Sequence, residues 1–259
     1  MTNQDHIGTL SEACAQSEAD ALSDAAAQTP APADAEQTDE RTLIANVLAN
    51  QNNMYAFLST LFRHELTQAQ IDEIPSMRLP AQTQNAHLDK GYRNLVRYMN
   101  HSNEFTHTEL AADFLHTFIG NTQNSKLVAY PYESVQMSEE RLLLQEQHTQ
   151  VLATYRENKV ALNTDINEPE DHIAFELEFM QIMGERAYEL ITDPSQDEEA
   201  YLEPLRAKRN FLIAHLLEWT PKFVNEINAV SKTLFYRAVG DILLGCLELD
   251  NELLDELVA

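Results

Sequence analysis

The sequence predicts an all-α protein: one bundle of about nine or ten helices over residues 41–259, preceded by a disordered acidic tail over 1–40. Glycine is scarce, at six of 259 residues, while Ala, Leu, Glu and Gln are plentiful, and this composition favours helices. No run alternates apolar and polar residues with the β-branched enrichment of a strand. From Arg41 onward, apolar residues instead recur at helical intervals.

The predicted tail differs sharply in composition from the rest of the chain. Residues 1–40 contain nine acidic residues, no Lys or Arg and no aromatic residue. Such a segment buries too little apolar surface to offset the entropy lost on ordering it. We therefore expect 1–40 to be disordered and 41–259 to fold as a single domain.

The first half of the domain is expected to contain four helices, over 42–65, about 67–75, 84–101 and 106–120. Thr67 and Gln70 have the spacing of a capping box, and Pro75 should end the short helix that they open. Thr106 and Glu109 have the same spacing, and Gly120 is a natural stop.

The second half is expected to contain four more long helices, over 139–158, from Pro169 to about Ile191, over 202–219 and over 231–249. Ser138 is the expected cap of the first, and Pro169 has a position typical of a first turn. The helix from Pro169 is apolar on several sides, which places it at the centre of a bundle.

The net charge of −25, from 17 basic and 42 acidic residues, limits the kinds of molecule that the protein is expected to bind. It disfavours nucleic acid, because phosphates are repelled and no basic stripe is present. A basic protein or peptide fits, as does plain solubility. Two unpaired cysteines, no secretory signal and no long apolar run together predict a cytoplasmic protein without stable membrane insertion.

Enzyme chemistry finds little support. Asp113 and His116 give a single acid-x-x-His pattern, whereas helical di-iron sites need two Glu-x-x-His pairs. His172 and Glu176 share a helix face, but two ligands do not make a metal site. Cys246 lies in an apolar stripe, as a packed hydrophobe does. We expect no catalytic residue, no metal and no cofactor.

Two short segments stand out between the helices. In Tyr130-Pro-Tyr-Glu-Ser-Val135, the proline predicts a rigid, non-helical turn that carries two aromatic rings. The rings could bind a partner or could simply anchor the loop to the bundle. In Glu168-Pro-Glu-Asp-His172, the acids suit a helix N-terminus. The histidine gains nothing there, and a solvent-facing Asp171–His172 pair that bonds a peptide is equally open.

Together with Ala112–Gly120 and Phe211–Trp219, these segments resemble the TorD/DmsD family of cytoplasmic redox-enzyme maturation chaperones. The resemblance covers about 42–250. Two positions depart from the family pattern: Thr117 stands where a leucine is common, and Gln136 where an aromatic residue is common.

The resemblance implies a molecular chaperone rather than an enzyme. Its partner would be the apo catalytic subunit of a molybdenum-cofactor oxidoreductase, bound at its twin-arginine leader or N-terminal region and held in the cytoplasm until cofactor insertion. Some members form domain-swapped dimers or bind guanine nucleotide weakly, so a monomer or a swapped dimer is expected. The implied peptide-binding residues are Phe114, Phe118, Tyr130, Pro131, Tyr132, Ser134, Pro169, Asp171 and His172.

In the groove that we expect, Phe114 and Phe118 line one helix face, the two tyrosines close one side, and acids such as Glu133, Glu170 and Asp171 receive the arginines. Three other functions stay open. One is a nitrate-reductase-type assembly chaperone whose client lacks a twin-arginine leader. The others are a helical metal-dependent enzyme and a helical adaptor for another basic partner.

Overall fold

The computed structural model describes residues 32–80, 82–120, 127–162 and 167–258. The chain divides into two units, Met1–Asp39 and Glu40–Ala259, and the second contains the hydrophobic core. Of the predicted disordered tail over 1–40, residues 1–31 lie outside the described residues, whereas 32–40 form the first part of helix α2 (Pro32–Arg63).

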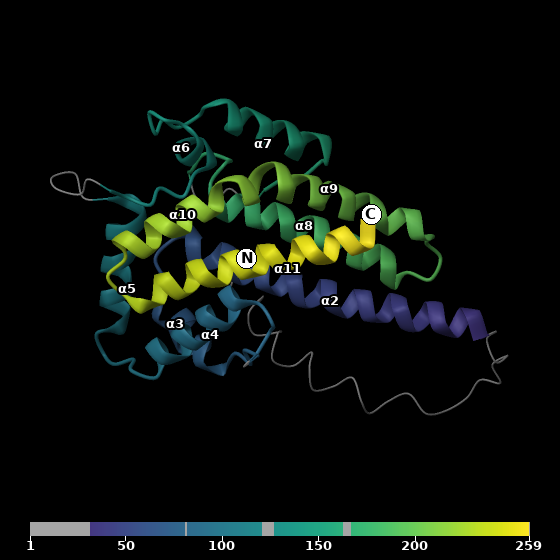
Figure 1. Ribbon diagram of the computed structural model, residues 1–259, viewed down its shortest axis with the longest axis horizontal. Helices are drawn as coiled ribbons and strands as arrows, with labels where there is room; N and C mark the ends of the chain where they lie inside the picture. The colour runs from purple at the N-terminus through teal and green to yellow at the C-terminus, as the bar shows by residue number, and fades with distance from the viewer. Residues whose placement is uncertain (1–31, 81, 121–126, 163–166, 259) are drawn as a thin grey trace. The chain divides into compact units, whose positions relative to one another are not determined.

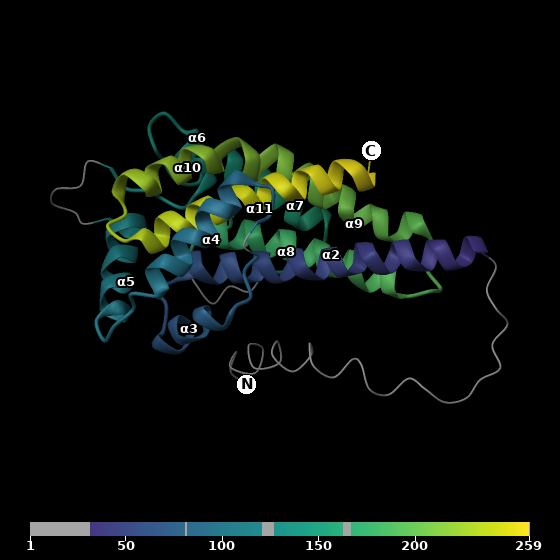
Figure 2. The same cartoon turned by 60° about the horizontal axis from the view of Figure 1, so that its bottom comes forward.

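The regular secondary structure of the described residues is helical and includes no β-strand, which confirms the all-α prediction. Figures 1 and 2 show the helices α2 (Pro32–Arg63), α3 (Gln68–Glu73), α4 (Ala86–Met99), α5 (Thr106–Phe114), α6 (Glu133–Met137), α7 (Glu146–Glu157), α8 (Ile173–Thr192), α9 (Glu198–Phe211), α10 (Leu217–Val230) and α11 (Leu234–Val258). A 3₁₀ turn, Ile74–Ser76, follows α3, and π-helical turns follow α5 (Leu115–Ile119) and join α9 to α10 (Leu212–Leu216).

Two long helices, α8 and α11, organise the core. α11 packs against α4, α9 and α10, and α8 packs along α9, while α6 contacts α7 and α10 (Figure 1). The most apolar stretch of α8 is wholly buried, as its sequence predicts: Ile173, Ala174, Phe175, Leu177, Phe179 and Met180. A helix with apolar residues on several sides must lie inside the bundle, because each exposed face would leave apolar surface in water.

Local capping signals predict some helix ends correctly. Thr67 and Gln70 form the expected capping box at α3. Gly120 ends the helix that begins at Thr106 and adopts φ +82°, a conformation that glycine adopts without steric cost. The second capping box is wrong. Thr106 is already the first residue of α5, and its hydroxyl accepts a hydrogen bond from the backbone N–H of Asn103 at 2.8 Å.

Three boundaries in the second half differ from prediction. Ser138 ends α6 instead of opening a long helix, and α7 begins only at Glu146. Pro169 lies in a turn, and its backbone carbonyl accepts a hydrogen bond from the N–H of His172. The helix α8 therefore begins only after this turn, at Ile173. The expected end at 219 does not occur, because the π-helical turn carries the chain from α9 directly into α10, which continues to Val230.

Asp113 fixes the start of α11. Its carboxylate accepts hydrogen bonds from the backbone N–H groups of Lys232 and Thr233, both at 2.8 Å, and from the hydroxyls of Ser231 and Thr233. These donors immediately precede α11, so Asp113 supplies from α5 the acceptors that an N-cap normally supplies locally. Burial alone would raise the pKa of Asp113, but these hydrogen bonds outweigh burial and lower it.

We predict that Asp113→Ala lowers the free energy of unfolding by about 2–4 kcal/mol, because several buried donors lose an ionised acceptor. Asp113→Asn, which keeps the shape, should cost less. Urea unfolding followed by circular dichroism measures both. Since the folded-state pKa lies below the ordinary value of 3.8, the wild-type advantage should be full above that pH and disappear as the pH falls further. An advantage that persists in strong acid would contradict this account.

Candidate functional site

Two segments far apart in sequence meet at the N-terminal ends of α6 and α8, and we call this contact the motif junction. It joins Pro131–Ser134 to Asp171–Ile173. Tyr132 and His172 form an isolated antiparallel bridge, Glu133 donates its N–H to the carbonyl of Asp171 at 3.0 Å, and Ile173 donates to the carbonyl of Pro131 at 2.9 Å. The prediction of a rigid turn holds only up to Tyr132, because the next five residues form α6.

Two acids tie the motif junction together. The carboxylate of Asp171, which is fully buried, accepts the backbone N–H of Ser134 at 2.8 Å and so caps the start of α6. The hydroxyl of Tyr132 donates to the carboxylate of Glu168 at 2.6 Å. Each acid therefore has a structural reason to occupy its position.

His172 is buried and caps α8 instead of facing solvent, which overturns that interpretation of the sequence. Its Nδ1 accepts the backbone N–H of Ala174 at 3.1 Å, and this role requires a neutral ring. Burial, followed by the nearby charge of Arg63, lowers the pKa of His172 to about 3. The side chain is thus a neutral cap at physiological pH.

A buried acidic cluster lies behind the motif junction and consists of Glu133, Glu176, His215 and Trp219. His215 Nδ1 lies 2.9 Å from the carboxylate of Glu133, and the Trp219 indole donates to Glu176 at 3.0 Å. Burial, and then the charge of Glu133, raise the pKa of Glu176 well above its usual range. Its surroundings therefore favour the protonated form of Glu176. No local pattern in the sequence indicates this cluster, because its members come from three separate helical segments.

The nine expected peptide-binding residues are brought together only in part. Seven are buried, and only Tyr130 and Pro169 are partly exposed. Tyr130, Pro131, Tyr132, Ser134, Pro169, Asp171 and His172 all lie at the motif junction, whereas Phe114 and Phe118 lie in the aromatic core. The Phe118 ring contacts Phe62 at 5.7 Å and Tyr236 at 5.3 Å between centroids, so it lines no open groove.

The acids expected to receive arginines are also engaged. Glu133 and Asp171 are buried. Glu170 accepts a hydrogen bond from His148 at 2.8 Å. Its partial burial would raise its pKa, but the bond to His148 outweighs burial and lowers it.

Thr117 and Gln136, the two departures from the family pattern, both form hydrogen bonds to neighbouring segments. Thr117 is buried, and its hydroxyl donates to Asp113 while its carbonyl accepts the N–H of Ala129 at 2.9 Å. The Gln136 amide donates to the carbonyl of Tyr130 at 2.9 Å and to the carboxylate of Glu226 at 2.8 Å. In this chain, hydrogen bonds therefore hold a segment where apolar side chains are common.

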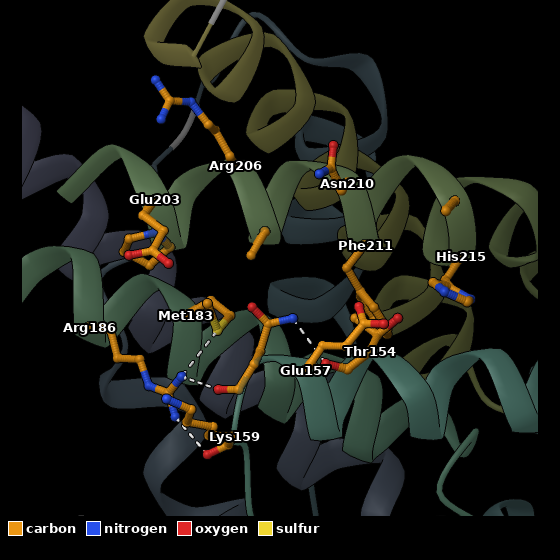
Figure 3. Close-up of a pocket in the computed structure, with 14 residues that line it drawn as sticks. Thr154, Glu157, Lys159, Met183, Arg186, Glu203, Arg206, Asn210, Phe211 and His215 are labelled. Carbon is orange, nitrogen blue, oxygen red and sulfur yellow. Dashed lines mark hydrogen bonds between the residues drawn. The ribbon is translucent and has the colours of Figure 1, made fainter. Parts of the chain in front are cut away.

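An open cleft of about 590 Å³ lies between α7, α8 and α9 (Figure 3). Its apolar part comprises Met183, Pro204, Ala207, Phe211 and Ala214, and its polar residues include Thr154, Asn158 and Asn210. His215, which also lines it, is the residue bonded to Glu133. The cleft and the motif junction are therefore joined by one buried hydrogen bond.

Acids remain available in the cleft while most cations are bound. Arg186 donates to the carbonyls of Asn158 and Lys159, as Figure 3 shows, and Arg206 pairs with Glu199. Glu157 on α7 and Glu203 on α9 are exposed and form no ion pair among the described residues. Two cleft cations, Lys159 and Arg186, also form no ion pair among the described residues, so unpaired acids and unpaired cations are equal in number. The two exposed carboxylates are nevertheless accessible to a cationic group beside the apolar part of the cleft.

Among the described residues, no three His, Cys, Asp or Glu side chains are grouped as a metal site would require. None of the helices described is both long and apolar enough to cross a membrane.

Comparison with known proteins gives one consistent result. Residues 84–225 match the family model described as nitrate reductase delta subunit. The chain is 30% identical over 208 residues to a protein named chaperone protein TorD from Aliivibrio salmonicida, covering 78% of this chain and 93% of that protein. It is 30% identical over 207 residues to the TorD chaperone of Vibrio atlanticus and 31% identical over 208 residues to that of Aliivibrio fischeri, with the same coverage.

We predict that Glu176→Gln makes stability less sensitive to rising pH. The unfolded chain releases the Glu176 proton near pH 4.5, but the folded chain keeps it, so the wild type loses stability as the pH rises above 4.5 toward the raised pKa. The variant has no such proton, and its advantage over the wild type should grow with pH across that range. Urea unfolding at a series of pH values measures this difference.

The matched control is Glu189→Gln, an exposed acid on the same helix. Its difference from the wild type should stay small and nearly constant with pH. A constant difference for Glu176→Gln as well would mean that Glu176 is ionised in the folded protein.

Proposed function

This chain belongs to the TorD family of chaperones, and we propose that it binds the leader or N-terminal region of a molybdenum-cofactor oxidoreductase subunit. It would hold that subunit in the cytoplasm until the cofactor is inserted. The relatives are named chaperones, a role that involves no catalysis, so the chain is a chaperone and not an enzyme.

The observation that carries the proposal is the link between the motif junction and the cleft. Glu133 belongs to the first motif segment, its N–H is bonded to Asp171 of the second, and its carboxylate is bonded to His215 in the cleft. The segments that carry the family resemblance thus position a concave surface with unpaired acids. Binding surfaces of proteins are commonly of this kind, with a rigid frame behind an open site.

The cleft suits the basic start of a leader. Glu157 and Glu203 lie on separate helices, so an arginine pair could engage both. Each exposed pair contributes only about 0–1 kcal/mol and weakens with salt, so charge mainly orients the peptide and speeds its association. The apolar cleft residues supply contact for the alkyl parts of the arginine side chains.

We propose two roles for the nine residues expected to bind peptide. Tyr130 and Pro169 retain exposed surface and can touch the peptide directly. The other seven are buried and would act by holding the frame: Phe114, Phe118, Pro131, Tyr132, Ser134, Asp171 and His172. A site that is already rigid loses less conformational entropy when the peptide binds, and the buried residues can raise affinity in this way.

A second candidate is a nitrate-reductase-type assembly chaperone, favoured by the description of the matched family model. Its client would have an N-terminus without a twin-arginine pair. Isolation of the chain from its own cells, followed by sequencing of the bound protein, would distinguish the two. The client itself and the oligomeric state are open under both candidates.

We predict that Glu157→Gln/Glu203→Gln weakens binding of a synthetic twin-arginine leader about three- to tenfold, because two weak ion pairs are lost. The loss should be largest at low salt and should shrink as salt is added. Isothermal titration calorimetry at two salt concentrations measures both effects.

The matched control is Glu252→Gln/Glu256→Gln, which removes the same charge from exposed positions on α11. It should bind nearly as the wild type does. An equal loss in both variants would indicate an effect of net charge alone and would place the arginines outside the cleft.

We predict that Tyr130→Ala weakens binding of the same peptide by about 1–2 kcal/mol, as expected for a tyrosine that contacts a partner. Tyr188→Ala is the control, since this tyrosine is also accessible but lies on α8 outside the cleft lining. Calorimetry with thermal unfolding of each variant measures affinity and fold together. Unchanged affinity in a folded Tyr130→Ala protein would remove Tyr130 from the peptide contact.

A further inference from the structure

An apolar surface lies at the loop between α6 and α7. We define the leucine surface as Leu127, Met137, Leu142, Leu143 and Leu144, with exposed fractions of 40, 42, 47, 45 and 60%. Of the twelve large exposed hydrophobic residues in the described part of the chain, seven fall between 115 and 144. Such concentration is unusual, because scattered single apolar residues are normal on a surface but clusters mark interaction sites.

The leucine surface is held by specific contacts. Arg141, within the loop, bonds the carboxylate of Glu226 and donates to the carbonyl of Val128 at 2.7 Å. Its guanidinium also lies over the Tyr130 ring, 5.7 Å from the centroid. These contacts fix the loop between α10, the segment around Val128 and the motif junction. The leucines are therefore presented outward by an anchored loop.

The backbone of this loop supports the same conclusion. Arg141 and Leu144 adopt φ values of +55° and +59°, a region that is costly for residues with a Cβ atom. Strained backbone persists only where surrounding contacts enforce it, and it is found most often at functional sites. In this backbone conformation Leu144 is 60% exposed.

Charge indicates the kind of partner. Glu139, Glu140 and Glu146 are exposed around the leucines, while Arg141, the cation of the loop, is neutralised by Glu226. A second copy of this chain would present the same acids and a net charge of −25, so two copies repel each other. A partner with an apolar segment next to basic residues is complementary to this surface in both respects.

We infer that the leucine surface receives the apolar segment of the client's leader, and this inference rests on the proposed function. Its position suits that role. α7, of twelve residues, begins two residues after Leu144 and ends at the cleft, so it spans about 18 Å at 1.5 Å per residue. A leader with its basic start in the cleft can place an adjoining apolar helix of similar length along α7 and onto the leucines.

The test uses the full chain and two synthetic peptides. The first has two adjacent arginines followed by an alanine–leucine segment, and in the second every leucine is replaced by serine. The variant is Leu142→Ser/Leu143→Ser/Leu144→Ser. The control, Leu43→Ser/Val96→Ser/Phe105→Ser, removes three equally exposed apolar residues from other elements. Circular dichroism establishes that each protein is folded, and the single variant Leu143→Glu is used if the triple variant is not.

We expect the variant to bind the first peptide at least tenfold more weakly than the wild type does, and the control variant to bind it as the wild type does. For the second peptide, the wild type and the variant should show the same weak affinity. If the variant binds the first peptide as tightly as the wild type, the inference is wrong while the proposed function stands. If the wild type binds neither peptide, the proposed function fails and the inference fails with it.

Sedimentation velocity tests the remaining alternative, in which the leucine surface joins two copies of this chain. A wild-type dimer that dissociates in the variant, with unchanged affinity for the first peptide, would show that the leucine surface joins two copies of this chain and would overturn the inference. A monomer in both proteins, combined with the tenfold loss, supports it.

Discussion

The buried carboxylate of Asp171 and its hydrogen bond to the backbone of Ser134 hold the site together. They join residues 37 positions apart and fix the start of α6. Because Glu133 is the first residue of α6, its carboxylate is thereby aimed at His215 in the cleft. Without that carboxylate, the start of α6 would lose its acceptor inside the protein, where no water replaces it. This contact, together with the backbone hydrogen bonds of the motif junction, therefore sets the positions of α6 and of the cleft wall.

Burying so many acids in one region has an electrostatic cost, and the structure limits it in different ways. Asp113 and Asp171 accept backbone N–H groups, which replace the lost hydration. Burial and the charge of Glu133 raise the pKa of Glu176, which favours its neutral form, and His172 stays neutral as a helix cap. The number of buried charges is therefore smaller than the number of buried ionisable residues. Neutral groups that act as caps or donors can lie this close together without strong repulsion.

The sequence predicts features that depend on local interactions and misses those that depend on distant ones. The Thr67–Gln70 box and the Gly120 stop involve neighbouring residues, and both are correct. Ser138 has the chemistry of a cap, but Arg141 is bonded by Glu226, 85 positions away, and this contact holds the following loop out of a helix. The nearby sequence left a solvent-facing His172 open because the Tyr132 ring, which lies 5.1 Å from the His172 ring between centroids, is 40 positions away. Two of the segments that carry the family resemblance, Pro131–Ser134 and Asp171–Ile173, meet in the structure, but the resemblance did not indicate which side chains remain exposed.

The distribution of cations connects the cleft to the leucine surface. Arg141 is bonded by Glu226, Arg186 by two carbonyls, and Lys222 by the carbonyl of Gln136. Only Arg141 of these three is paired with a carboxylate, and the exposed acids around the leucines, Glu139, Glu140 and Glu146, form no ion pair among the described residues. Their field extends about 8–10 Å at physiological salt, whereas apolar surfaces gain free energy only on contact. For the proposed client, a basic segment without apolar length would be attracted but released quickly. An apolar segment without basic residues would gain no electrostatic steering, so selectivity requires both features on one peptide.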